Sequence, residues 1–139
     1  MPLALLEELY ASDETLLLAL CIWREARGET PAAKLGVAWT VRNRCAMAPA
    51  QGFKKDVAGN ILRPWAFSSF MAGDPNASKY PQDGDPSWKD SIAAAESAGP
   101  DPTGGAVFYF SRPLVAPPAA WGLVTHCASI GGLSFYKPR

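Results

Sequence analysis

The chain has 139 residues, of which 48% are hydrophobic and 19% charged, and its 13 basic residues balance 13 acidic ones. This length predicts a single domain over residues 1–139, and the composition excludes an intrinsically disordered chain. Because the formal net charge is zero, we expect no nucleic-acid partner. Three cysteines and one histidine are too few for a disulfide framework or a closed zinc site, so we expect no metal.

The apolar segments are too short for a membrane protein. The longest uninterrupted run extends from Leu16 to Trp23, whereas a bilayer span needs about 20 residues. We therefore expect no stable membrane insertion. Residues 1–10 contain Glu7 and Glu8 and lack a basic start, so they do not resemble a signal peptide.

The first third of the chain predicts two helices. Ser12, followed by acidic residues, is typical of a helix N-terminus. The run 16–23 is apolar on every face, which is typical of a buried helix, and Gly28 is a plausible end. Thr30-Pro31 then predicts the cap and first residue of a second helix that ends near Cys45.

The rest of the chain predicts loops and then strands. Residues 46–87 are rich in Pro, Gly, Asp, Asn and Ser and predict loops with a short helix at 55–62. A helix over 88–97 is expected, capped by Ser87. Strands are predicted at 106–110, 123–127 and 133–136, with a hairpin turn at Gly131-Gly132. Helices first and a small antiparallel sheet last give an α+β fold class.

Glu25 carries the clearest chemical signal. Helical spacing places it on one face with Cys21 and Ile22, near the C-terminus of the first helix. Apolar surroundings and the negative helix end both disfavour an ionised carboxylate, and a protonated carboxyl is what a general acid needs. The alternative is a structural glutamate paired with Arg24 or Arg27.

Four further features are candidates for a site. Glu29 would share a face with Glu25 if the helix continued through Gly28, or else it would bind backbone amides in a loop. The segment 65–70 has aromatic residues around two serines in a loop region, which favours a groove over a core. The turn 101–106 contains two glycines that would let a long ligand approach the backbone.

His126 is the fourth candidate, with a cysteine as its partner. A Cys/His amidase or peptidase using Cys127 or Cys45 is an alternative, although no motif accompanies these residues. A structural histidine on a strand is the other interpretation of His126.

Five blocks occur in a distinctive order. They are Glu25-Ala26-Arg27-Gly28-Glu29, an aliphatic helix ending in Asn43-Arg44, Trp65-Ala66-Phe67-Ser68, Asp101-Pro102-Thr103-Gly104-Gly105-Ala106, and Ile130-Gly131-Gly132 with Phe135-Tyr136. In this order they resemble the cell wall hydrolases of the spore-cortex-lytic (SleB-like) family. The resemblance extends over about residues 16–137.

The resemblance implies a lysozyme-like domain that cleaves the MurNAc–GlcNAc bond of peptidoglycan. Glu25 matches the family's catalytic glutamate. The substrate-binding residues that we predict are Glu29, Trp65, Phe67, Ser68, Thr103 and Tyr109. The partner is then the glycan strand of peptidoglycan, bound by a monomer that needs no cofactor. Arg42 and Arg44 would attract carboxylates of the polymer or form a solvated helix end.

The family resemblance favours a lytic transglycosylase, in which the 6-hydroxyl of the sugar attacks and a 1,6-anhydro end forms. The alternatives are a muramidase with a second carboxylate and a non-catalytic peptidoglycan-binding or phage structural module. The enzyme would act on the cell wall, in the periplasm or outside the cell. Because no leader is visible, phage-type release through a holin or association with a virion would be a route to it.

Overall fold

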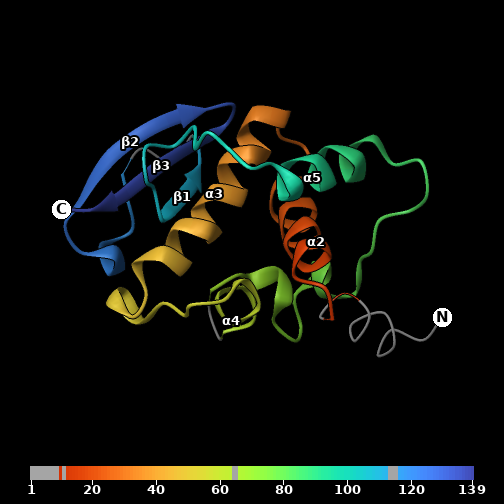
Figure 1. Cartoon of the computed structure of the whole chain (residues 1–139), viewed down its shortest axis with the longest axis horizontal. Coiled ribbons are helices and arrows are strands. Elements are labelled where there is room, and N and C mark those ends of the chain that lie inside the picture. Colours follow the sequence, from red (N-terminus) through yellow and green to blue (C-terminus); the bar gives the residue numbers. More distant parts are fainter. Residues whose placement is uncertain (1–9, 11, 64–65, 113–115) are drawn as a thin grey trace.

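The computed structural model describes residues 10, 12–63, 66–112 and 116–139. Helices occupy the first two thirds of the chain and an antiparallel sheet the last third (Figure 1), which confirms the predicted α+β class. The helices are α2 (Glu14–Ala26), α3 (Pro31–Met47), α4 (Val57–Leu62) and α5 (Pro86–Glu96), and the strands are β1 (Phe108–Ser111), β2 (Val124–Ile130) and β3 (Leu133–Pro138). None of the helices described is both long and apolar enough to cross a bilayer.

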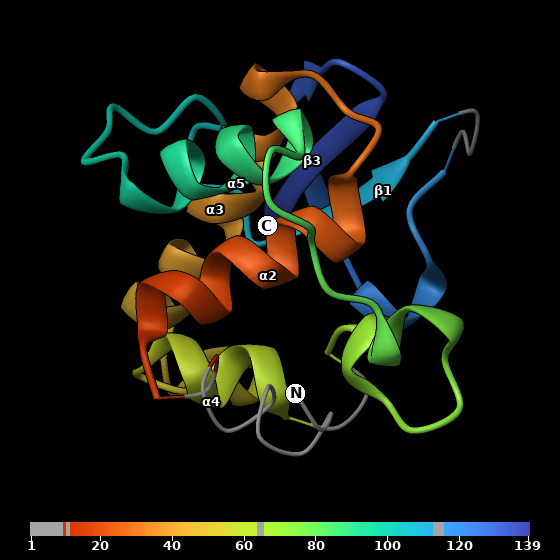
Figure 2. The same ribbon diagram turned by 90° about the vertical axis from the view of Figure 1, so that its right-hand side faces the viewer.

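Helix α2 is buried because other helices cover it on several sides. In Figure 2 it lies between α4 and α5, and α3 contacts it as well. Nine of its residues are buried, which explains why the run 16–23 is apolar on every face. The cap is Asp13 and not Ser12, because the Asp13 carboxylate accepts hydrogen bonds from the amides of Thr15 and Leu16.

Helix α3 joins the helical part to the sheet. It begins as predicted, with the Thr30 side chain accepting from the Ala33 amide at 3.1 Å and Pro31 at the first position. One side of α3 contacts α2 and α5, and another contacts β1 and β2. Gly36 lies against the fully buried ring of Phe135 on β3.

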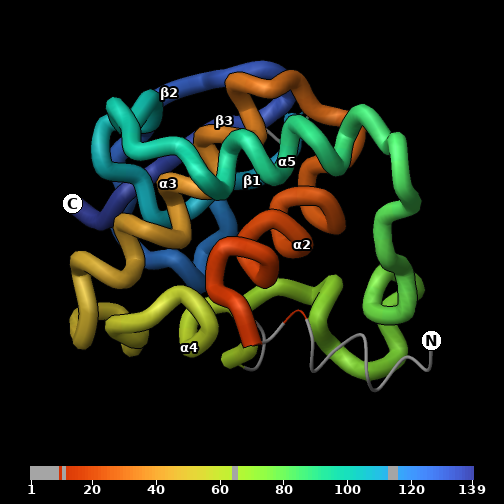
Figure 3. Tube along the Cα trace, turned by 45° about the vertical axis from the view of Figure 1, so that its right-hand side comes forward, coloured from red at the N-terminus to blue at the C-terminus, as the bar shows by residue number. Residues whose placement is uncertain are grey.

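Helix α5 begins two residues earlier than predicted. Its cap is Asp85, whose carboxylate accepts from the Ser87 amide at 2.9 Å, so Ser87 is within the helix and is not the cap. Figure 3 shows α5 running beside both α2 and α3. Between α4 and α5, the described residues 66–85 form two short 3-10 turns, η2 (Ser68–Phe70) and η3 (Pro75–Ser78).

The sheet has the strand order β1-β3-β2, with both pairs antiparallel. The turn at Gly131-Gly132 joins β2 to β3, as predicted, and Gly131 has the positive φ of 55° that favours glycine. Strand β2 reaches Ile130, three residues beyond its predicted end, with a bulge between His126 and Ala128. The short β1 brings Tyr109 beside β3 and toward α2.

Candidate active site

Glu25 is hydrogen-bonded to Tyr109 across the helix–sheet boundary. The Tyr109 hydroxyl donates to Glu25 Oε1 at 3.2 Å, and the two residues are 84 positions apart in the sequence. Glu25 lies in the last turn of α2 and is partly exposed. This hydrogen bond orients Glu25 through one of its two carboxyl oxygens.

The surroundings keep Tyr109 in its neutral, donating form. Burial raises the pKa of Tyr109 well above 10, and the charge of Glu25 raises it further, whereas Arg44 lowers it. The buried thiol of Cys21, also close to Glu25, has a raised pKa for the same principal reason. Tyr109 therefore remains a hydrogen-bond donor at neutral and mildly alkaline pH.

The two arginines beside Glu25 do not pair with it. Arg24 donates to backbone carbonyls, and Arg27 donates to Asn76 Oδ1 at 2.9 Å. Among the described residues the one ion pair is Lys34–Asp90, at 3.9 Å. The interpretation of Glu25 as a glutamate paired with a neighbouring arginine is therefore wrong.

Glu29 is not on the helix face of Glu25, because α2 ends at Ala26. Its Oε1 accepts from the Gly132 amide at 2.8 Å, in the turn between β2 and β3. Glu29 therefore binds a backbone amide, which was the second of the two roles predicted for it. A part in substrate binding stays a prediction.

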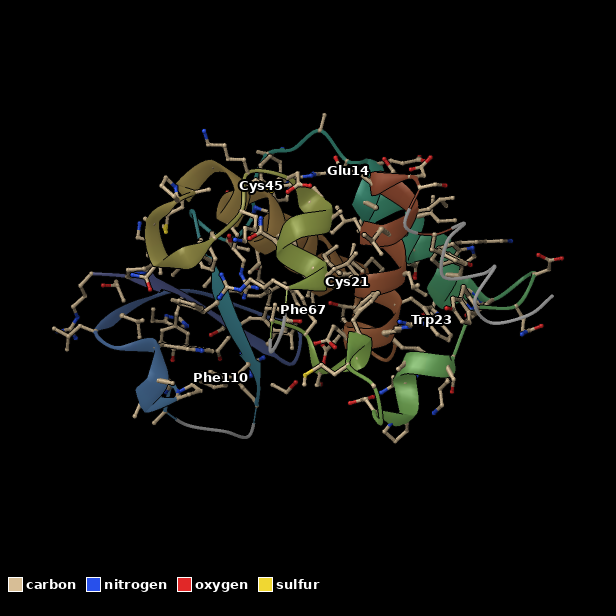
Figure 4. The ribbon with its side chains drawn as sticks, turned by 90° about the horizontal axis from the view of Figure 1, so that it is seen from below. Glu14, Cys21, Trp23, Cys45, Phe67 and Phe110 are labelled. Atoms are coloured by element: carbon tan, nitrogen blue, oxygen red, sulfur yellow. The ribbon has the colours of Figure 1, made fainter. Side chains whose placement is uncertain are left out.

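The segment 65–70 divides between core and surface. Phe67 is 4% exposed and belongs to the main hydrophobic core, so its prediction as a groove residue is wrong. Figure 4 shows Phe67 near Cys21 inside the molecule. Ser68, the next residue, is exposed and stays a candidate for substrate contact. Trp65 lies outside the described residues.

Thr103 is also buried rather than exposed to a ligand. It is fully inaccessible, its hydroxyl donates to Asp101 Oδ1 at 2.7 Å, and it accepts from the Ala106 amide at 3.1 Å. The prediction that it binds substrate is corrected for that reason. Asp101 accepts the hydrogen bonds that hold this turn together. The sequence had suggested that a long ligand approaches the backbone here.

Asn43 attaches this turn to α3, a role that we did not predict. Its amide donates to Asp101 Oδ2 at 2.9 Å and to the Ala106 carbonyl at 3.0 Å. The sequence did contain a signal for this role, because Asn43 is a polar residue at the end of an apolar helix face. The contact fixes the entry into β1, and hence the approach of Tyr109 to Glu25.

Arg42 and Arg44 are occupied within the protein. Arg42 donates to the carbonyls of Ala95 and Ser97 at the end of α5. Arg44 donates to the Val107 carbonyl at 2.8 Å, and its guanidinium lies over the rings of Phe53 and Phe67. The sequence suggested that Arg42 and Arg44 either form a solvated helix end or are free to attract the polymer. The structure supports neither prediction.

Burial raises the pKa of all three cysteine thiols, Cys21, Cys45 and Cys127. A nucleophilic cysteine needs the opposite shift. His126 is exposed, and its Nε2 lies 2.9 Å from Ser129 Oγ. These observations disfavour a Cys/His amidase or peptidase. In the parts of the chain described, no three His, Cys, Asp or Glu side chains gather as a metal site would need.

Two hollows adjoin the end of α4, and the larger of them also borders α2. The larger, of about 380 Å³, is lined mainly by apolar residues of α2, α4 and the segment 70–80. The smaller, of about 250 Å³, adjoins it and shares Leu62, Phe70 and Ala72. Glu25 lines neither hollow, so both lie apart from the carboxyl itself.

The chain is similar to one protein family and to two solved structures. The model of the Cell Wall Hydrolase family matches residues 28–136, a range that begins three residues after Glu25. The catalytic domain of the Bacillus cereus SleB protein is 26% identical, with a TM-score of 0.66 and 92% of each chain covered. The catalytic domain of the germination-specific lytic transglycosylase SleB from Bacillus anthracis is 27% identical, with a TM-score of 0.67.

That second comparison covers 89% of this chain and 93% of the solved structure. No curated protein sequence matches the chain. The family match includes most of the residues, and the two structural similarities extend over the helices and the sheet alike. The chain therefore belongs to the cell wall hydrolase family.

Proposed function

We propose that the protein is a peptidoglycan lytic transglycosylase that cuts the MurNAc–GlcNAc bond with Glu25 as general acid and base. The observation that carries this proposal is the hydrogen bond from Tyr109 to Glu25. It holds one carboxyl oxygen and leaves the other for proton transfer. The similarity to a SleB lytic transglycosylase supports the same reaction.

The proposed reaction needs one enzyme carboxyl used twice. Glu25 first donates its proton to the glycosidic oxygen as the bond from that oxygen to the anomeric carbon of MurNAc breaks. The 6-hydroxyl of the same MurNAc then attacks that carbon, and its proton returns to Glu25. Because the nucleophile belongs to the substrate, its effective concentration is high without a second carboxylate.

Simple hydrolysis is the second candidate reaction. A hydrolase needs a second carboxylate about 5–9.5 Å from the first, and Glu29 was the candidate from the sequence. Its Oε1 is bonded to the Gly132 amide, but a carboxylate bonded through one oxygen keeps the other, so a muramidase would still use Glu29 or another carboxylate.

The proposal is tested by replacing Glu25 with its near-isosteric amide. We expect Glu25→Gln to lower the cleavage of purified sacculi by about 10²- to 10⁴-fold, the contribution typical of a general acid. Mass spectrometry of the wild-type products should show 1,6-anhydro-muropeptides. Glu96→Gln, at an exposed position of α5, is the matched control and should leave cleavage unchanged.

Each other result has a defined meaning. Reducing ends that carry an added water would replace the transglycosylase by a muramidase. Cut peptides on intact glycan would favour an amidase. Full activity of Glu25→Gln would remove Glu25 from the mechanism, and glycan binding without any product from the wild type would favour a non-catalytic module.

A further inference from the structure

Arg24, the residue before Glu25, is a buried cation bound to three backbone carbonyls. Only 7% of its surface is exposed. Its Nε donates to Lys79 at 3.1 Å, Nη1 to Ser69 at 3.3 Å and Nη2 to Ala77 at 3.1 Å. The rigid guanidinium fork thereby joins α2 to three points of one segment, residues 68–79.

Two aromatic rings also lie against the guanidinium. Its carbon lies 4.7 Å from the ring centre of Phe70 and 4.9 Å from that of Tyr80. No carboxylate in the described part of the chain forms an ion pair with it. Since the carbonyls and rings belong to the segment 68–80, Arg24 interacts with that segment rather than neutralising an acidic group.

Apolar packing holds this segment only in part, through Phe70, which packs against the main core. The segment also borders the hollow of about 380 Å³, whose lining includes Ala72 and Ala77 together with leucines of α2 and α4. Interior side chains normally leave few spaces of this size. The attachment of the segment therefore depends strongly on polar contacts.

The polar contacts with the segment come from the last turn of α2 and its C-cap. Arg27 donates to Asn76 at 2.9 Å, whereas the indole nitrogen of Trp23 donates at 2.9 Å to Asp85, the cap of α5, beyond the segment. Arg24 contributes three of the bonds and lies between the other two residues in sequence. It is the principal anchor of the segment.

Consecutive residues of α2 thus contact different parts of the chain. Glu25 is bonded to Tyr109 on β1, whereas Arg24 holds Ser69, the neighbour of the exposed Ser68. We infer that Arg24 is a positioning residue, which fixes segment 68–79 as part of the glycan-binding surface next to Glu25. This inference rests on the proposed function, because it assigns that segment to the substrate of the same site.

The test compares Arg24→Met and Arg24→Lys with the wild type, well below the unfolding temperature. We expect Arg24→Met to raise KM for soluble glycan strands about tenfold, the effect of losing roughly one net hydrogen bond, with kcat within about threefold. Hydrogen exchange of the amides in 68–79 should rise by a similar factor. Arg24→Lys keeps the charge but not the fork, so it should give an intermediate KM.

Arg42→Met is the matched control. Arg42 is also an arginine bonded to backbone carbonyls and placed over an aromatic ring, that of Trp39, but it holds the end of α5. The Arg42→Met substitution should leave KM and the hydrogen exchange of the amides in 68–79 unchanged. An equal rise in KM for Arg42→Met would reduce the effect to general destabilisation and overturn the inference.

Two further outcomes would also overturn it. One is an unchanged KM with faster exchange in 68–79, which would make the anchor purely structural, and the other is unchanged exchange. If Arg24→Met does not fold, Arg24→Lys decides alone: a raised KM supports positioning and an unchanged KM rejects it.

Binding separates this inference from the proposed reaction. In proteins that also carry Glu25→Gln, Arg24→Met should weaken the binding of soluble glycan strands about tenfold. Equal binding with and without Arg24 would reject positioning and leave the role of Glu25 intact. Persistent cleavage by Glu25→Gln would reject the reaction, while the binding and exchange comparisons would still test Arg24.

Discussion

At the scale of single residues, neighbours in the last turn of α2 have separate tasks. Glu25 accepts a hydrogen bond from β1, and Arg24 and Arg27 attach the segment that follows α4. The side chains of residues 24 and 25 leave the helix about 100° apart, so one turn can serve two directions. The flanking arginines are therefore structural neighbours of Glu25 rather than its counter-ions.

Tyr109→Phe tests how Glu25 is oriented. Removing the hydroxyl deletes one hydrogen bond to the carboxyl, and we expect kcat on soluble glycan strands to fall about tenfold. KM and the unfolding temperature should change little, because the ring and its packing remain. Tyr136→Phe, on β3, is the control and should keep full activity. A Tyr109→Phe enzyme with unaltered kcat would show that Glu25 needs no such donor.

At the scale of elements, the turn before β1 depends on one carboxylate. Asp101 accepts from the Asn43 amide and from the backbone and hydroxyl of Thr103. Burial raises the pKa of Asp101, but these hydrogen bonds, with one from Gly105, outweigh it and hold the pKa below its usual 3.8. A lowered pKa in the folded state means that the charged form stabilises the fold.

This predicts a pH-dependent stability. The contribution of Asp101 should be complete above about pH 4, the range of an unfolded aspartate, and should be lost as the pH falls through the folded pKa. At pH 7, Asp101→Asn should lower the free energy of unfolding by about 1–3 kcal/mol. Urea denaturation should show that the difference in the free energy of unfolding between Asp101→Asn and the wild type becomes smaller below about pH 4. Asp83→Asn, at an exposed position, is the control. A stability difference for Asp101→Asn that does not depend on pH would contradict the role given to the Asp101 charge.

The contact between α3 and β3 requires a residue without a side chain. A Cβ on Gly36 would lie 2.5 Å from the ring of Phe135, which is fully buried and closely packed. We expect Gly36→Ala to lower the free energy of unfolding by about 1–3 kcal/mol, despite the better helix propensity of alanine. Gly28→Ala, with no atom within 4 Å, should be near neutral. Thermal unfolding of both variants tests this prediction. If Gly36→Ala is as stable as Gly28→Ala, Phe135 can move aside.

At the scale of the whole molecule, α3 and the residues at its ends connect the helices to the sheet. Glu29, just before α3, bonds the turn between β2 and β3. Near the other end, Asn43 and Arg44 bond carbonyls at the entry into β1. The distance between Glu25 and Tyr109 therefore depends on contacts at both ends of one helix.

Glu29→Ala tests this connection. Loss of a hydrogen bond to a charged group should lower the free energy of unfolding by about 1.5–3 kcal/mol. Below the unfolding temperature KM for glycan strands should stay within about twofold if Glu29 has only this structural role. Glu14→Ala, at the exposed first residue of α2, serves as the control. A large rise in KM with little loss of stability would instead place Glu29 in substrate binding.

The amino-acid sequence was enough to predict the helices, the hairpin, the fold class, the family and Glu25 as the candidate acid. These depend on local signals: caps such as Thr30-Pro31, an apolar run, a glycine turn and short motifs. Even here two caps shifted, because Asp13 and Asp85 cap the helices in place of Ser12 and Ser87.

The tertiary structure alone decided which polar and aromatic groups face each other. Phe67 and Thr103 are in motifs that resemble a binding site, yet burial gives them packing and turn roles. The partner of Glu25 is 84 residues away, and those of Arg24 are 45 to 55 residues away. Such contacts depend on how helices and strands pack, which local propensity and periodicity do not contain.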